Sequence, residues 1–418
     1  MNCFLFRGAY INQVTVSGLT PIMTAACFDG HLDIVKYLVE RKAELDHKDK
    51  NDQTIIHLAA KNNQDEVIEE ILQSASDDYM VNENDQFDNT PLHLASAAGY
   101  LETVKVLVKH NAQIDNKNED EQTPLHMAAN HGHSEVVEYI VQQDKNSVND
   151  LDEDDNTALH LAAREKMTRT VEVLLEHGSD VRKRNGLDWT PLDCAAASGS
   201  YKCVQKILEA GADVDPMDRK RTTPLHLTAI HGHPQVAVLL LENGAKIEIE
   251  NDEGKNALEL AIDHGNRTVA EAILSSEHWR RAMETSNVSS DGLLNTPMRM
   301  LIKKFPELAA KVMDNCIAKI EEKDSQDLQF NFEFAFIEDT FNYKRETNVL
   351  PKDKGPEALS GSILLKKQRN STFEYRPDNS NPYDSNSLVV QNNHPLMIMT
   401  KQKNKSLLKH PLCLALLR

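Results

Sequence analysis

Two stretches, Thr90-Pro91-Leu92-His93-Leu94-Ala95 and Thr123-Pro124-Leu125-His126-Met127-Ala128, repeat nearly the same six residues 33 positions apart. A Thr can cap the free N–H groups at the start of a helix, and Pro is tolerated at the first helical position because no N–H donor is needed there. Gly99 and Gly132 follow at the same distance and favour the left-handed turn that ends a helix. The pattern therefore predicts a short helix between Thr-Pro and Gly.

A second helix is expected after each Gly, because apolar residues recur there at helical spacing. Val104 and Leu107 form this face in one unit, and Val136 and Ile140 form it in the next. A single helix pair cannot bury such a face, so neighbouring pairs must stack. A stacked helix pair with this length and signature resembles the ankyrin repeat.

The unit recurs with little variation along the chain. Its first positions are Thr20, Thr54, Thr90, Thr123, Thr157, Thr190, Thr223 and Asn256, at spacings of 33 to 36 residues. We expect an irregular segment at residues 1–17 and eight ankyrin repeats at 18–274, which make the fold a mainly α solenoid. Irregular end units suit caps. Lys166 replaces the usual Gly and marks a weak point with some backbone strain.

Composition and charge narrow the class of protein. The chain has 418 residues and a net charge of -19, which argues against a general nucleic-acid binder because phosphate contacts require a basic face. Six scattered cysteines without a C-x-x-C pair favour free thiols in a reducing setting. We find no secretory signal and no apolar run of about 18 residues. These features predict a cytoplasmic chain.

The sequence gives little support for a catalytic or metal-binding site. No Gly-rich phosphate loop, H-E-x-x-H motif or nucleophile elbow is present, so we expect no enzyme and no cofactor. Asp150, Asp152 and Asp154 imitate the start of a calcium loop, but Asp155 and Leu161 stand where the loop needs Gly and Glu. The histidines of the repeats are expected to bond neighbouring backbone groups, and no metal site is predicted.

The loops that connect the repeats, here called finger loops, are acidic with two exceptions. Arg182-Lys183-Arg184 and Arg219-Lys220-Arg221 form basic tips. Arg182, Arg184, Arg219 and Arg221 are therefore candidate partner-binding residues, and the simpler alternative is a solvated surface.

The repeat pattern stops after residue 274, and a helical and β linker is predicted at 275–343. We expect helices at 277–283, at 298–302 behind Thr296-Pro297, and at 307–320. Phenylalanines at positions 330, 332, 334 and 336 alternate with other residues and predict a strand, which could pair with 341–343 or 372–375. Residues 344–393 read as a polar, partly disordered segment, and 394–418 as a C-terminal helical segment.

This part of the chain carries a more specific resemblance. Thr296-Pro-Met-Arg-Met-Leu-Ile-Lys-Lys-Phe-Pro-Glu-Leu-Ala, then Val312-Met-Asp-Asn-Cys-Ile317, the Phe-alternating strand and Leu407-Leu-Lys-His-Pro-Leu-Cys413 follow the eight repeats. The whole resembles the transient receptor potential channels of the ankyrin subfamily (TRPA). The resemblance implies the cytosolic sensing and coupling part of a tetrameric, calcium-permeable cation channel that responds to thermal, chemical or mechanical stimuli. Other channel subunits would be its partners, at the cytoplasmic face of the plasma membrane.

Two kinds of site follow from the resemblance. Of the family's electrophile-sensing cysteine positions, two fall on Ala282 and Thr296, and only Cys316 matches. On a helix over 307–320, Cys316 would share a stripe with Val312 and Ile320, which favours a buried thiol over a reactive one; Lys304 and Lys311 could lower its pKa only if they turned towards it. A basic cluster near the C-terminus suits a lipid surface or is merely solvated: Lys401, Lys403, Lys405 and Lys409.

The chain stops about where a first membrane helix would begin in that family, so we expect a truncated, spliced or incompletely predicted product. The mechanical hypothesis is that bending or local melting of the repeats, with Lys166 as a soft joint, changes how residues 276–343 press on a membrane domain. The alternative is a soluble ankyrin adaptor that binds a protein partner.

Overall fold

A computed structural model describes residues 10–27, 31–74, 78–285, 287–288, 294–320, 329–332, 363–365, 399, 404–411 and 413. The chain divides into two compact units, residues 1–219 and 220–418, and each is described by itself. The predicted segments 1–17 and 344–393 lie largely outside the described residues.

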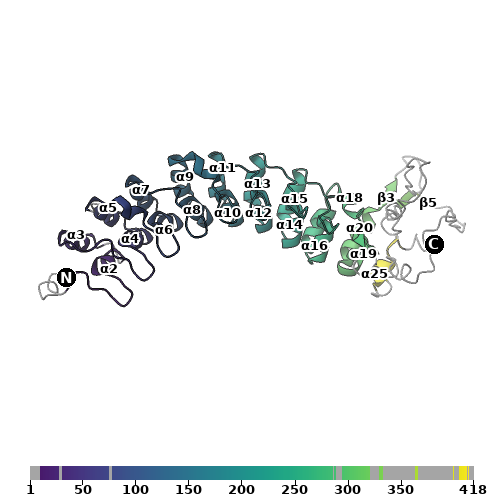
Figure 1. Cartoon of the computed structure of the whole chain (residues 1–418). Coiled ribbons are helices and arrows are strands. Elements are labelled where there is room, and N and C mark those ends of the chain that lie inside the picture. The colour runs from purple at the N-terminus through teal and green to yellow at the C-terminus, as the bar shows by residue number, and fades with distance from the viewer. Residues whose placement is uncertain are drawn as a thin grey trace. The chain divides into compact units, whose positions relative to one another are not determined.

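The first unit contains six helix pairs. The first helices of the pairs are α2 (Pro21–Cys27), α4 (Ile55–Lys61), α6 (Pro91–Ala98), α8 (Pro124–His131), α10 (Ala158–Arg164) and α12 (Pro191–Ser198). The second helices are α3 (Leu32–Glu40), α5 (Asp65–Ser74), α7 (Leu101–Lys109), α9 (Ser134–Gln143), α11 (Thr168–Glu176) and α13 (Tyr201–Glu209). Two 3-10 turns, η1 (Asp78–Asn82) and η2 (Lys145–Asn149), extend two of the connections. Within this unit the first helices form one row and the second helices another (Figure 1).

The predicted helix limits are confirmed. Thr90 and Thr123 occupy the N-cap positions of α6 and α8, and Pro follows each of them as the first helical residue. Gly99 and Gly132 end these helices with φ angles of 78° and 80°. Lys166 takes the same left-handed conformation, with a φ of 64°, although a side chain opposes it.

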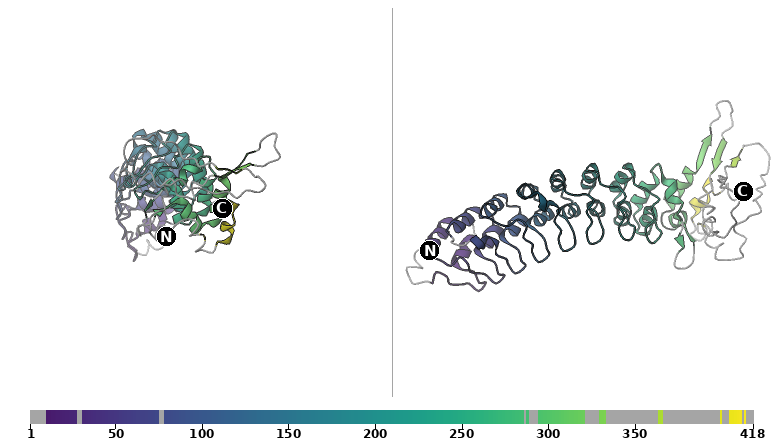
Figure 2. Two further views of the ribbon diagram at one scale, coloured as in Figure 1. Left: turned by 90° about the vertical axis from the view of Figure 1, so that its right-hand side faces the viewer. Right: turned by 45° about the horizontal axis from the view of Figure 1, so that its top comes forward.

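Small and apolar residues fill the interior of the stack. Ala95 and Ala128 on the first helices are fully buried, as are Val104 and Leu107 on a second helix. Alanine keeps the first helices thin, so successive pairs approach closely enough to bury the apolar face that one pair leaves open. The finger loops of the first unit project along one edge (right-hand view of Figure 2).

The second unit begins with two further helix pairs. They are α14 (Pro224–His231) with α15 (Pro234–Glu242), and α16 (Ala257–Asp263) with α17 (Arg267–Leu274). The short helix α18 (Trp279–Met283) and an antiparallel pair of two-residue strands, β1 (Asn287–Val288) and β2 (Leu294–Asn295), follow. Another helix pair, α19 (Pro297–Lys304) and α20 (Pro306–Asn315), then packs through α19 against α16. Thr296 caps α19 as the Thr residues cap the repeats.

The small sheet of the linker differs from the sequence-based expectation. The helix predicted over 307–320 ends at Asn315, and β3 (Ile317–Ile320) follows, so Ile320 does not share a helical stripe with Cys316. β4 (Gln329–Phe332) includes Phe330 and lies between β3 and β5 (Ile363–Leu365), antiparallel to both. The partners predicted for this strand are therefore wrong for residues 329–332, because both of its edges are already paired. Positions 334 and 336 lie outside the described residues.

The last described helix is α25 (Lys405–Leu408), which packs against α20. In the part of the chain that the structure describes, no helix combines the length and apolar character needed to cross a membrane.

Candidate functional site

Histidines of the repeat motif form bridges from one repeat to the finger loop of the next. His93 Nδ1 accepts a hydrogen bond from the Thr90 N–H at 3.1 Å, and His93 Nε2 donates to the Gln122 carbonyl at 2.9 Å. His160 makes the same two contacts, with Thr157 at 3.2 Å and with the Trp189 carbonyl at 3.0 Å. Further bridges of this kind start at His57, His126 and His226.

The bridges require neutral imidazole rings. Because Nδ1 accepts from a backbone N–H, it carries no proton, and the single ring proton must be on Nε2, where the carbonyl accepts it. Burial lowers the pKa of His93 and of His160 to about 4, well below the ordinary value of 6.5. The histidines therefore hold the stack together at neutral pH without a buried charge.

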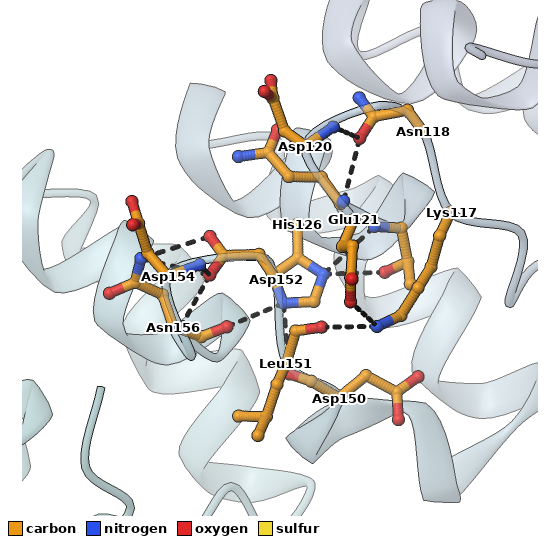
Figure 3. Close-up of polar contacts among 12 residues, drawn as sticks. Lys117, Asn118, Asp120, Glu121, His126, Asp150, Leu151, Asp152, Asp154 and Asn156 are labelled. Atoms are coloured by element: carbon orange, nitrogen blue, oxygen red, sulfur yellow. Dashed lines mark hydrogen bonds and ion pairs between the residues drawn. The ribbon is translucent and has the colours of Figure 1, made fainter. Parts of the chain in front are cut away.

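The finger loops are also joined directly to one another in the first unit. The N–H of Glu153 donates to the Asp120 carbonyl at 3.1 Å, and the N–H of Gly186 donates to the Asp154 carbonyl at 2.7 Å. Figure 3 shows the polar network beneath one such contact, where His126 lies between the finger loops on either side. There the Asp152 carboxylate accepts from the N–H groups of Asp154 and Asn156, so these acidic residues shape the loop itself.

The sixth repeat has Asp193 in place of the histidine. Its Oδ2 accepts from the Thr190 N–H at 2.8 Å and from the Thr190 hydroxyl at 2.7 Å, which preserves the cap. Its Oδ1 has no hydrogen-bond partner among the described residues. Burial raises the pKa of this carboxyl group to about 7, so at neutral pH a large fraction keeps its proton.

The eighth repeat joins the linker through a different cap. Asn256 Oδ1 accepts from the Glu259 N–H at 3.0 Å, as an N-cap side chain should. Its Nδ2 donates to the Ala282 carbonyl at 2.8 Å and to the Thr285 hydroxyl oxygen at 3.0 Å. The amide therefore contributes what the histidine contributes elsewhere, namely a bond to the segment 29 residues ahead. Burial raises the pKa of the adjacent Glu259 carboxyl to about 7.

Lysines on the linker helices make further contacts with the last repeat. Lys304 Nζ donates to the carbonyls of Ile262 and Asp263 at the C-terminal end of α16, at 3.1 and 2.9 Å. A cation is favoured there because the last carbonyls of a helix lack partners and carry partial negative charge. Lys311 Nζ lies 3.3 Å from Glu271 Oε1 and 3.2 Å from Ser275 Oγ on the side of α17.

We call this set of contacts the junction: Asn256, Thr285, Lys304 and Lys311 with the groups they bond. An ion pair between Arg267 and Glu307 adds to it. The sequence predicted the helix that carries Lys304, because Thr296-Pro297 repeats the helix-start motif of the repeats. The partners of the two lysines could not be read from the sequence, since each lies about 40 residues away along the chain.

Cys316, the electrophile-sensing candidate, lies just outside this junction. It is the C-cap residue of α20 and is only 4% exposed. The two lysines considered as activating charges, Lys304 and Lys311, bond the last repeat instead. Ala282 and Thr296, the positions of the other family cysteines, contribute a backbone acceptor and a helix cap.

The basic finger tips take part in bonds within the stack. Arg184 donates to the Asp188 carbonyl at 2.7 Å and to the Met217 carbonyl at 2.9 Å, and Arg221 donates to the Glu250 carbonyl at 3.3 Å. Arg184 and Arg221 therefore each link their own finger loop to the next one. Arg182 and Arg219 are exposed.

The C-terminal basic cluster is described only in part. Lys401 and Lys403 lie outside the described residues, Lys405 begins α25, and Lys409 is exposed behind it. No group of three His, Cys, Asp or Glu side chains suited to a metal ion occurs among the described residues.

Comparison with known proteins agrees with this architecture. The family model for ankyrin repeats (3 copies) matches residues 1–83, 75–152, 142–218 and 214–282. A transient receptor potential cation channel subfamily A member 1 homolog from Caenorhabditis elegans is 33% identical over 347 residues. That alignment covers 81% of this chain and 28% of the nematode protein, so the chain spans just over a quarter of its relative. The chain belongs to the ankyrin-repeat family, and over most of its length it is similar to this TRPA homolog.

Proposed function

We propose that this chain is the sensing and coupling portion of a TRPA-type cation channel, in which the junction passes movements of the repeats to the linker helices. The observation that carries the proposal is the set of bonds from α16 and α17 to α18, α19 and α20. A free adaptor has no need of the additional helix pair α19 and α20, which is bonded to the last repeat. The similarity to the nematode channel homolog extends over most of this chain and supports the same assignment.

In this proposal the linker helices transmit the movement of the repeats. A displacement of α16 reaches α19 through Lys304, and a displacement of α17 reaches α20 through Lys311. Two contacts on different helices resist rotation as well as translation, so the linker follows the last repeat as a body. The proposed channel responds to a thermal, chemical or mechanical stimulus, conducts calcium and assembles as a tetramer.

The test is a chimaera in which this chain replaces the corresponding part of the nematode TRPA homolog. We expect stimulus-evoked calcium entry in transfected cells, and we expect Lys304→Met with Lys311→Met to reduce the evoked entry several-fold at equal surface expression. Both substitutions keep the aliphatic stem and remove the charge, so packing is retained.

Lys105→Met is the matched control, because Lys105 makes an exposed ion pair with Glu102 inside one helix of the third repeat. Such a pair contributes little to stability. The coupling proposal fails if the chimaera reaches the surface but conducts no evoked current, or if the paired junction variant behaves like Lys105→Met.

A second candidate function is a protein-binding adaptor, and exposed apolar finger tips favour it. Phe87 is 54% exposed and Leu187 is 64% exposed, each at the tip of a finger loop in the first unit. Exposed Arg182 and Arg219 could add charge recognition. Substituting Phe87 and Leu187 by Ser should abolish binding of a defined partner without changing the melting temperature, and a variant that binds equally well excludes these tips.

A further inference from the structure

Three sulfur atoms meet in the second unit, where the C-terminal segment packs against α20. Cys413 Sγ lies 3.8 Å from Met313 Sδ and 3.9 Å from Met399 Sδ. Met313 belongs to α20, whereas Met399 and Cys413 come from either side of α25, which packs against α20 (Figure 1). All three side chains are fully buried.

The spacing suits a single metal ion bound by sulfur. Metal–thiolate bonds are about 2.3 Å long, so three sulfurs arranged at 120° around one ion are about 4 Å apart. Thiolate and thioether donors together select a soft ion, and monovalent copper is the biological ion of that type.

The net charge of the three ligands favours monovalent copper over zinc at this site. One thiolate and two neutral thioethers supply a single negative charge, so Cu⁺ gives a neutral complex, whereas Zn²⁺ leaves a positive charge in a buried site. An uncompensated buried charge is strongly unfavourable. Among the described residues, no three His, Cys, Asp or Glu side chains form a group that could hold a metal ion.

We propose that Met313, Met399 and Cys413 form a binding site for a monovalent copper ion, and we call these residues the sulfur triad. On binding, the Cys413 S–H bond breaks, its proton leaves to solvent, and the sulfur electron pair forms the bond to copper. Each thioether donates a lone pair, and no atom changes oxidation state. Burial raises the pKa of the Cys413 thiol to about 11, so the thiol is protonated at neutral pH before the ion arrives.

A bound ion would fasten the C-terminal segment to α20. Besides the packing of α25, His410 Nε2 lies 3.0 Å from the Asp314 carboxylate of α20. Two metal–sulfur bonds to residues of the terminal segment and one to α20 would turn this interface into a cross-link. The sulfur triad is therefore a place where copper availability can stiffen the end of the linker.

The test uses the reduced full chain under anaerobic conditions, with Cu(I) presented as its bicinchoninate complex. We expect one ion per chain to be withdrawn from the chelator, with release of one proton per ion. Met313→Leu, Met399→Leu and Cys413→Ser should each weaken binding at least about tenfold, because loss even of a partner outside the ligand set costs about 10- to 100-fold. Exchange of Met for Leu conserves volume, and a matching melting temperature without copper shows that each variant is folded.

Met300→Leu and Cys194→Ser are the controls. Met300 is a buried methionine on α19, and Cys194 is a buried thiol in the first unit. Both should bind copper as the unmodified chain does. The proposal is overturned if no ion is withdrawn, if folded Met→Leu variants of the triad bind as tightly as Met300→Leu, or if loss of Cys194 weakens binding as much as loss of Cys413, which would indicate adventitious thiol binding only.

Discussion

The junction can be tested at Asn256, whose side chain does two separable things. Substitution by Thr keeps an oxygen to cap α16, as Thr223 does for α14, but removes the amide that donates to Ala282 and Thr285. A typical hydrogen bond contributes about 1 kcal/mol net, and a buried acceptor left without a donor costs about 1–3 kcal/mol. Since two bonds are lost, opening of α18 should become easier by about 2–3 kcal/mol.

Native-state hydrogen exchange measures this opening directly. Every 1.4 kcal/mol changes an equilibrium about tenfold, so the α18 amides that include Ala282 should exchange about 30- to 140-fold faster in Asn256→Thr. Amides of α8, in the first unit, should not change. Thr223→Ser is the matched control, because it alters an N-cap and keeps the hydroxyl. Unchanged exchange in α18 would refute the assignment of Asn256 as a bridge, and equal acceleration in α14 would mean that the whole unit is weakened instead.

Three further predictions concern the repeats and the thiols. The pKa of His160 is about 4 in the folded chain, below 6.5, so its bridge is intact at neutral pH and its stabilisation is lost as the pH falls from 6.5 towards 4. Urea unfolding at pH 4.5 against pH 7 should show a loss of roughly 2–3 kcal/mol from this residue, absent in His160→Gln. Cys316, at 4% exposure, should react with a maleimide at least about tenfold more slowly than half-buried Cys27, as followed by mass spectrometry. Lys166→Gly should raise the free energy of unfolding by about 1 kcal/mol, because glycine adopts a φ of 64° without a side-chain clash.

Each of these has a clear contrary result. If His160→Gln loses as much stability in acid as the unmodified chain, the neutral bridge is not the acid-labile element. If Cys316 is the first thiol to be modified, its buried position does not describe the chain in solution. If Lys166→Gly leaves the urea midpoint unchanged, and hydrogen exchange shows the fifth repeat as protected as its neighbours, Lys166 is not a soft joint.

The repeats were readable because their signals are local. The cap, the first-position proline and the terminal glycine of α6 all lie within ten residues, between Thr90 and Gly99, so backbone chemistry alone predicts where the helix starts and stops. The same reasoning placed Thr296 at the start of α19. It failed over Ile317–Ile320, where a helical pattern continues in the sequence but the chain forms β3. There, pairing with β4 outweighs helix propensity, and such pairing depends on residues far away in the chain.

The sequence alone thus determined the repeat, its register and the family, because the residues that start and end the first helix of each repeat lie within about ten positions of one another. Only the tertiary structure decided which partners the side chains take. The amide of Asn256 donates to Thr285, and Lys304 donates to the carbonyl end of α16. Cys413 contacts Met313, which is 100 positions away in the sequence. Contacts of this kind form after the helices have packed, and no pattern of neighbouring residues encodes them.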